Sequence, residues 1–107
     1  MPLPTISVVI PAFNAANSLP RAIGSALGQD PAPLEVIVVD DGSNDDTPSI
    51  LARYGGLIRT VRIENSGAGS ARNAGVGLAR GELIAFLDAD DEWMPGKLAA
   101  QQLALQA

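Results

Sequence analysis

Short apolar runs alternate with helical patterns along all 107 residues of the chain, and this alternation constrains its fold more than any other feature. The runs are nearly continuous, which is typical of strands buried on both faces of a sheet. They cover residues 5–10, 35–39 and 83–87, with a weaker strand marked by Ile58, Val61 and Ile63. A segment with the signals of a helix follows each run.

The helical segments either repeat apolar residues at offsets of three and four or begin with typical helix starts. They are predicted over residues 19–27, 48–54 and 71–79, and from Pro95 to the C-terminus. Strands that alternate with helices imply a parallel sheet with right-handed crossovers. We therefore predict an α/β, Rossmann-like domain, with a mostly parallel sheet of about four strands in the order 3-2-1-4, flanked by helices.

Some local details follow from single residues. Pro11 is expected to stop the first strand, because proline has no N–H for a ladder. Ser18 or Asn17 can cap the first helix, and Thr47 can cap the second. The apolar face of the helix over 71–79 consists mainly of small residues, so that helix can lie close to the sheet.

Composition excludes several kinds of chemistry. The chain has no cysteine and no histidine, which excludes disulfides, thiolate or histidine metal sites, and Ser-His-Asp triads. Its net charge of −5 argues against nucleic acid or an anionic membrane as a partner. No apolar run is long enough for a membrane span, and residues 1–15 lack the basic start of a secretory signal. We therefore expect a cytoplasmic location.

Acidic residues gather in two clusters, each following a predicted strand. They are Asp40, Asp41, Asp45 and Asp46 in the first cluster, and Asp88, Asp90, Asp91 and Glu92 in the second. Parallel strands end at one edge of the sheet, so the two clusters are expected to converge there. Carboxylates brought together repel, and a cation or a hydrogen-bonding ligand would relieve the repulsion. The alternative for either cluster alone is a solvated loop.

The carboxylates favour Mg²⁺ or Mn²⁺, which prefer oxygen ligands. On an extended chain, Asp88 and Asp90 would lie about 6.5 Å apart on the same side, so one could bind a metal and the other a sugar hydroxyl. Arg72 follows a glycine-rich, donor-rich segment at the start of the third helix, and a helix N-terminus favours phosphate. That segment contains Asn65, Gly67, Gly69 and Asn73. The alternative is a simple turn followed by a surface arginine.

Four motifs in register resemble the inverting family 2 glycosyltransferases over almost the whole chain. They lie at residues 7–14, 35–43, 65–75 and 81–91. The resemblance implies a GT-A fold, a nucleotide-diphosphate sugar donor, with a UDP-sugar favoured, and a divalent metal, Mn²⁺ or Mg²⁺. Asp88-Ala89-Asp90 matches the Asp-x-Asp motif of the family.

The resemblance also implies roles for single residues at the base end of the donor. Residues Pro11, Ala12, Phe13 and Asn14 would line the base pocket. Phe13 stands where the family usually has tyrosine, so stacking on the base is kept and a hydroxyl contact is lost. Asp41 would accept a hydrogen bond from the ring N–H of uracil, with Asp40 supporting it.

The remaining roles concern the ribose and the diphosphate. Arg72 would reach the base edge or a nearby phosphate, and Asn65 and Gly67 belong to the same donor-binding segment. Asp88, with Ala89 beside it, would bind ribose, and Asp90 would bind the metal that bridges the diphosphate.

Members of the family are longer than this chain, and their later half supplies the acceptor site and the general base. Residues 1–107 are therefore expected to be the donor-binding part of such an enzyme, with no catalytic residue of their own and a base beyond Ala107. Apolar surface left by a missing half would favour self-association. A non-catalytic nucleotide-binding fragment is the main alternative.

A receiver-type signalling domain is a remote alternative. Such a domain places an acidic pair after its first strand, where this chain has Pro-Ala-Phe-Asn. The sequence leaves open the sugar, the acceptor, the identity of the base and the oligomeric state.

Overall fold

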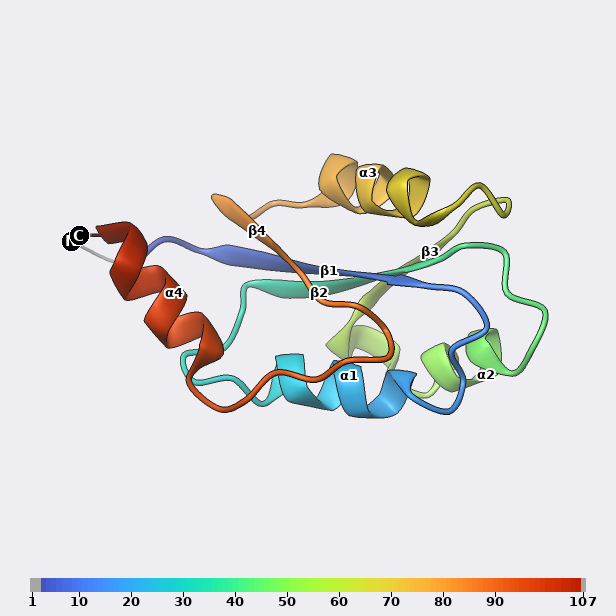
Figure 1. Ribbon diagram of the computed structural model, residues 1–107, viewed down its shortest axis with the longest axis horizontal. Coiled ribbons are helices and arrows are strands. Elements are labelled where there is room, and N and C mark those ends of the chain that lie inside the picture. The colour runs from blue at the N-terminus through green and yellow to red at the C-terminus, as the bar shows by residue number, and fades with distance from the viewer. Residues whose placement is uncertain (1–2, 107) are drawn as a thin grey trace.

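A four-stranded parallel sheet runs through the computed structural model, which describes residues 3–106 (Figure 1). Its strands are β1 (Ile6–Ala12), β2 (Glu35–Asp40), β3 (Arg59–Arg62) and β4 (Leu83–Phe86). They lie in the order β3-β2-β1-β4, and all three neighbouring pairs are parallel. The predicted fold class and strand order are therefore confirmed.

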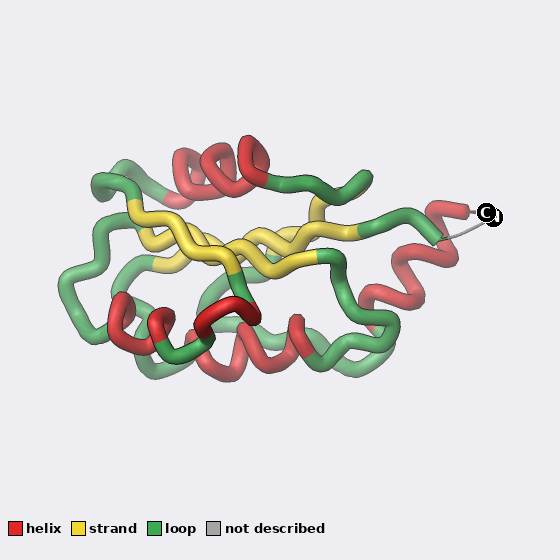
Figure 2. The backbone as a smooth tube through the Cα atoms, turned by 180° about the vertical axis from the view of Figure 1, so that it is seen from behind, coloured by secondary structure: helices red, strands yellow, loops and turns green. Residues whose placement is uncertain are grey.

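The helices form layers on both faces of the sheet. They are α1 (Leu19–Leu27), α2 (Thr47–Ala52), α3 (Ala68–Leu78) and α4 (Lys97–Gln106), with a short 3₁₀ turn at Gly55–Leu57. Figures 1 and 2 show α1 and α2 beneath the sheet and α3 alone on the opposite face. Helix α4 lies beside the amino end of β1, where the Gln102 side chain donates a hydrogen bond to the Pro4 carbonyl. Among the described residues, no helix has the length and apolarity needed to cross a membrane.

The core is divided between the two faces of the sheet because successive strand residues point in opposite directions. On the α1 side, Val8 and Ile10 pack with Leu19 and Ile23, all fully buried. A smaller cluster on the α3 side consists of Ile37, Val39 and Ala71. Both central strands are therefore buried on both faces, as their continuous apolar runs predicted.

Helix α3 lies close to the sheet because its inner face is small. Gly75 is buried directly over Val9, and a Cβ added at Gly75 would overlap the Cγ1 atom of Val9. Ala71, one turn earlier, is also fully buried. This confirms the sequence expectation for the small-residue face.

Pro11 does not stop β1, contrary to the prediction. The strand continues to Ala12, with Pro11 opposite Val39 of β2. On its other side, β1 pairs with β4, and the last bond there runs from the Leu87 N–H to the Val9 carbonyl. The next bond in that ladder would need an N–H from Pro11, which proline lacks. The proline therefore ends the pairing with β4 rather than the strand itself.

Two predicted helix caps are also wrong. Ser18 precedes α1 but makes no capping bond to the helix backbone. Helix α2 begins at Thr47 itself, and the Thr47 hydroxyl accepts a hydrogen bond from the Ala15 N–H instead of capping a helix. Both hydroxyls therefore have partners other than those that local sequence rules assign.

The amino edge of the sheet is held by Glu35, whose side chain is 10% exposed. Its carboxylate accepts hydrogen bonds from the Ser7 hydroxyl at 2.7 Å, the Arg80 N–H at 2.7 Å and the Arg59 guanidinium at 2.6 Å. Burial alone would raise the pKa of Glu35, but these donors outweigh it and hold the pKa below its ordinary value of 4.5.

The contact between α3 and the sheet predicts opposite effects for two glycines of one helix. Gly75→Ala should destabilise the fold by about 1–3 kcal/mol, because Val9 is branched and cannot move aside cheaply. Gly77→Ala should instead stabilise it by about 0.5 kcal/mol, since that site has no heavy atom within 4 Å of the added Cβ. Urea unfolding of both variants checks this, and equal stabilisation by both would contradict the close packing.

The lowered pKa of Glu35 predicts a pH-dependent effect on stability. Glu35→Gln should cost about 2 kcal/mol at pH 7, because it removes the charge that three donors face. A lowered folded-state pKa contributes stability above the unfolded value, and this is lost as the pH falls through the folded value. The difference from wild type should therefore shrink below pH 4.5.

The measurement is urea unfolding at pH 7 and again in the acid range. Glu64→Gln, a change at an exposed carboxylate, is the control and should stay within about 0.5 kcal/mol of wild type. A Glu35→Gln penalty that is the same at every pH would show that the carboxylate charge contributes nothing.

Candidate functional site

A cleft of about 370 Å³ lies at the carboxyl edge of the sheet. Four segments meet there: the ends of β1, β2 and β4, and the first turns of α3. The lining residues are Pro11, Ala12, Phe13, Asn14, Ala15, Ser18, Asp41, Ala68, Ala71, Arg72, Asp88, Ala89 and Asp90. The predicted convergence of Asp41, Arg72, Asp88 and Asp90 in one crevice is confirmed.

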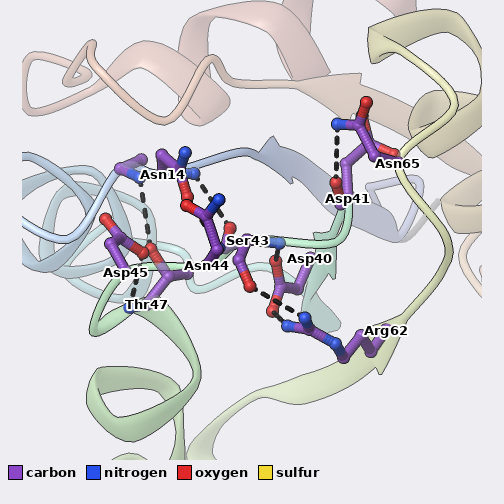
Figure 3. A network of polar contacts seen from close by, with 10 residues as sticks. Asn14, Asp40, Asp41, Ser43, Asn44, Asp45, Thr47, Arg62 and Asn65 are labelled. Carbon is purple, nitrogen blue, oxygen red and sulfur yellow. Dashed lines mark hydrogen bonds and ion pairs between the residues drawn. The ribbon is translucent and has the colours of Figure 1, made fainter.

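Asp40 is the last residue of β2 and Asp41 directly follows it, but their side chains turn to opposite sides. Asp40 is 3% exposed and pairs with Arg62 of β3 at 2.6 Å between Oδ2 and the guanidinium. Its other oxygen accepts the Ser43 N–H, and Arg62 also donates to the Ser43 carbonyl (Figure 3). Asp40 does not line the cleft, so its charge is used to hold the loop after β2.

Asp41 lines the cleft and is also fixed to the start of α3. Its Oδ1 atom accepts the Ser66 N–H at 2.8 Å, and its Oδ2 atom accepts the Gly67 N–H at 3.0 Å. The Asn65 side chain donates to the Asp41 carbonyl at 3.0 Å. Asn65 and Gly67 thus support Asp41 and do not line the cleft themselves. Each carboxylate oxygen has two acceptor positions, so Asp41 can still accept a bond from a ligand.

Arg72 and Asp88 face each other across the cleft, with 3.6 Å between the guanidinium and the carboxylate. Their side chains are 42% and 61% exposed, so the pair contributes at most about 1 kcal/mol to stability. A weak, exposed pair can separate when a ligand enters. The cleft therefore offers a cation and an acceptor side by side.

The two aspartates of the Asp-x-Asp motif are not on an extended chain, contrary to the expectation from their spacing. The Asp91 N–H donates to the Asp88 carbonyl at 3.0 Å, which closes a turn with Ala89 and Asp90 at its centre. Asp90 is exposed at the mouth of the cleft and makes no hydrogen bond or ion pair with any residue in 3–106. The same part of the chain contains no group of three or more carboxylates placed to hold a metal.

Phe13 is 50% exposed at the edge of the cleft. Asn14, next to it, has a left-handed backbone with φ of 48°, a conformation that asparagine tolerates better than most residues. Its side-chain oxygen accepts the Asn44 N–H, so this part of Asn14 already has a protein partner (Figure 3).

Sequence reasoning did not assign four lining residues to the site. These are Ala15, Ser18, Ala68 and Ala71. Three of them are alanines, whose side chains have no functional group that would mark a binding site. They contribute to the cleft because their small side chains leave space in it. The small-residue pattern of α3 was the one available hint, and it was interpreted only as packing.

Comparisons with known proteins agree with this geometry. Residues 7–107 match the family model described as glycosyl transferase family 2. Succinoglycan biosynthesis protein ExoO of Rhizobium meliloti (strain 1021) is 45% identical over 98 residues, covering 90% of this chain and 28% of ExoO. The putative teichuronic acid biosynthesis glycosyltransferase TuaG of Bacillus subtilis (strain 168) is 39% identical over 102 residues, covering 92% of this chain and 40% of TuaG.

A solved structure shows the same fold. S. aureus TarS 1-349 in complex with UDP-GlcNAc superposes with a TM-score of 0.86 at 30% identity, covering 95% of this chain and 31% of the TarS 1-349 chain. The GT-A type of fold is thereby confirmed, and the receiver-type alternative is excluded. This chain spans well under half the length of these relatives. The family model covers nearly all of it, and the chain belongs to glycosyl transferase family 2.

Proposed function

We propose that the cleft binds a nucleotide-diphosphate sugar, with UDP as the nucleotide, and that residues 1–107 form the donor-binding part of an inverting glycosyltransferase. The convergence of Phe13, Asp41, Arg72, Asp88 and Asp90 in one cleft is the observation that carries the proposal. TarS, which shares the fold, has been solved in complex with UDP-GlcNAc and with UDP.

The base end of the proposed site contains an aromatic ring and a fixed acceptor. Phe13 offers a half-exposed face for stacking. Asp41, held by two backbone N–H groups, stays an acceptor and complements a base that presents a ring N–H, as uracil does. Pro11, Ala12 and Asn14 would line the same pocket, and Asp88 would accept from the ribose.

The diphosphate end requires positive charge. Arg72 can supply some of it, and a divalent metal on Asp90 would supply the rest. Mg²⁺ and Mn²⁺ commonly use one or two protein carboxylates together with substrate phosphates. An exposed carboxylate that has no partner within residues 3–106 fits this pattern. When bound, such a metal would neutralise the diphosphate and stabilise it as a leaving group.

Transfer of the sugar also requires a general base near the acceptor. Each carboxylate in the cleft already has another proposed role. Asp41 binds backbone N–H groups and the nucleotide base, Asp88 beside Arg72 binds the ribose, and Asp90 binds the metal. No acidic residue follows Glu92 in the sequence. We therefore propose that the 107-residue chain by itself is a nucleotide-binding module, and that transfer depends on a base beyond Ala107.

Binding of UDP should depend on metal through Asp90. Asp90→Asn keeps the shape of the side chain and removes its charge, so it should abolish the gain in affinity that Mn²⁺ provides. Asp41→Asn should weaken binding about tenfold to a hundredfold with the metal still required, since it alters one charge-assisted hydrogen bond. Calorimetric titration of UDP with and without Mn²⁺ measures both effects.

Asp91→Asn is the matched control, because it removes the same charge from a residue that does not line the cleft. It should leave the effect of Mn²⁺ nearly unchanged. Equal, metal-independent affinity in all four proteins would show that these carboxylates belong to a solvated loop.

The chain alone should not transfer sugar. Purified residues 1–107, incubated with a UDP-sugar, Mn²⁺ and a panel of sugar acceptors, should give no glycosylated product above background, because the proposed general base lies outside these residues. Product formation, followed by mass spectrometry, would mean that Asp91 or Glu92 serves as the base.

A further inference from the structure

We propose that the loop at residues 43–47 is a positioning element for Phe13, with Ser43 and Thr47 as its positioning residues. This inference rests on the proposed function, because it assigns to Phe13 a nucleotide contact. It concerns residues that lie outside the cleft and touch no ligand in the proposed mode of binding.

The first observation is how the ladder between β1 and β2 ends. The Asp41 N–H donates to the Ala12 carbonyl at 2.8 Å. In a regular parallel ladder, the Asp41 carbonyl would next accept the Asn14 N–H. Here that carbonyl accepts the Asn65 side chain, and the Asn14 N–H donates to the Ser43 hydroxyl at 2.9 Å (Figure 3).

Gly42 allows the Asn14 N–H to bond to Ser43 instead of the Asp41 carbonyl. Its φ of 73° turns the chain, and a Cβ at this position would lie 2.7 Å from the Asn65 nitrogen. The turn removes the Asp41 carbonyl from β1 and brings Ser43 into its place. Phe13 thus lies between two residues, Ala12 and Asn14, that are both bonded to the segment after β2.

The second observation is that the loop binds three successive N–H groups. Beyond Asn14, the Ala15 N–H donates to the Thr47 hydroxyl at 3.2 Å, and the Ala16 N–H donates to the Asp45 carboxylate at 3.3 Å. Asp45 also accepts the Thr47 N–H at 2.8 Å. The Thr47 side chain beside Asp45 is the main cause that lowers the pKa of Asp45. Thr47, which is fully buried, therefore connects the loop to the segment that follows Phe13.

The position of the Phe13 ring depends on the backbone around it. A side chain that is 50% exposed has too few packing contacts to define its own position. Its backbone must do so, and the backbone of the next three residues is held by the loop. Loss of one of these bonds should let the 13–16 segment sample other conformations, so that the ring is placed for stacking only part of the time.

The decisive variants are Thr47→Val, which removes the hydroxyl and keeps the shape, and Thr47→Ser, which keeps the hydroxyl. In the 107-residue chain with Mn²⁺, Thr47→Val should weaken UDP binding about fivefold, while Thr47→Ser stays within about twofold of wild type. Binding of Mn²⁺-pyrophosphate, which has no base, should change less than twofold in both. Ser43→Ala provides a second removal of an acceptor and should resemble Thr47→Val.

A double-mutant cycle with Phe13→Ala separates positioning from general destabilisation. If Thr47 acts through the ring, Thr47→Val should have almost no further effect on UDP affinity once the ring is absent. A purely structural role would reduce affinity equally in both backgrounds, and would reduce pyrophosphate binding as well. Either result would overturn the inference.

Amide hydrogen exchange tests the same contacts without any nucleotide. The N–H groups of residues 14–16 should exchange slowly in wild type and Thr47→Ser, and at least tenfold faster in Thr47→Val. Unchanged exchange would overturn the inference whatever happens to UDP binding. If wild type shows the protection but binds no UDP, the proposed function fails, and the role assigned to Phe13 fails with it, while the loop contacts stand.

Discussion

The carboxylate of Asp41 accepts two N–H groups that precede helix α3, and the geometry of the cleft depends on this contact. A carboxylate that is 4% exposed needs donors, and a helix start has N–H groups without partners in the helix. The bonds to Ser66 and Gly67 meet both needs at once and join the end of β2 to the start of α3. Arg72 lies in the next turns of that helix, so its distance from the strand ends is set by the same contact.

The carboxyl edge would be unstable if its acidic residues were left to repel one another. Asp40 is neutralised by an arginine of β3, Asp41 by backbone N–H groups, and Asp88 by an arginine across the cleft. Asp90 alone of these four has no such partner among the described residues. Of these four carboxylates, Asp90 is thus the one left uncompensated in residues 3–106, and it lies at the mouth of the cleft, where it would attract a cation.

Sequence reasoning predicted the parts of this structure that depend on periodicity and topology. The continuous apolar runs identified strands buried on both faces, and alternation with helices identified a parallel sheet. Because such a sheet brings its strand ends to one edge, the sequence alone predicted that Asp41 and Asp88 would line one cleft, as they do. The close approach of α3 to the sheet was also predictable, since most residues at its apolar helical spacing are alanine or glycine. Whether these residues bind a nucleotide stays a prediction.

Only the tertiary structure decided which partner each polar group finds. Sequence rules for helix caps and strand ends consider only a few neighbouring residues. They predicted that Thr47 caps the helix that follows it and that Pro11 ends its strand. In the fold, Thr47 bonds to Ala15, thirty-two residues earlier in the chain, and Pro11 ends a ladder with a strand more than seventy residues later. The sequence by itself determined the sheet and the residues at its edge, because the pattern of apolar residues within each short segment shows which positions are buried. The tertiary structure decided the use of each hydrogen bond, because a donor takes the acceptor that folding brings nearest.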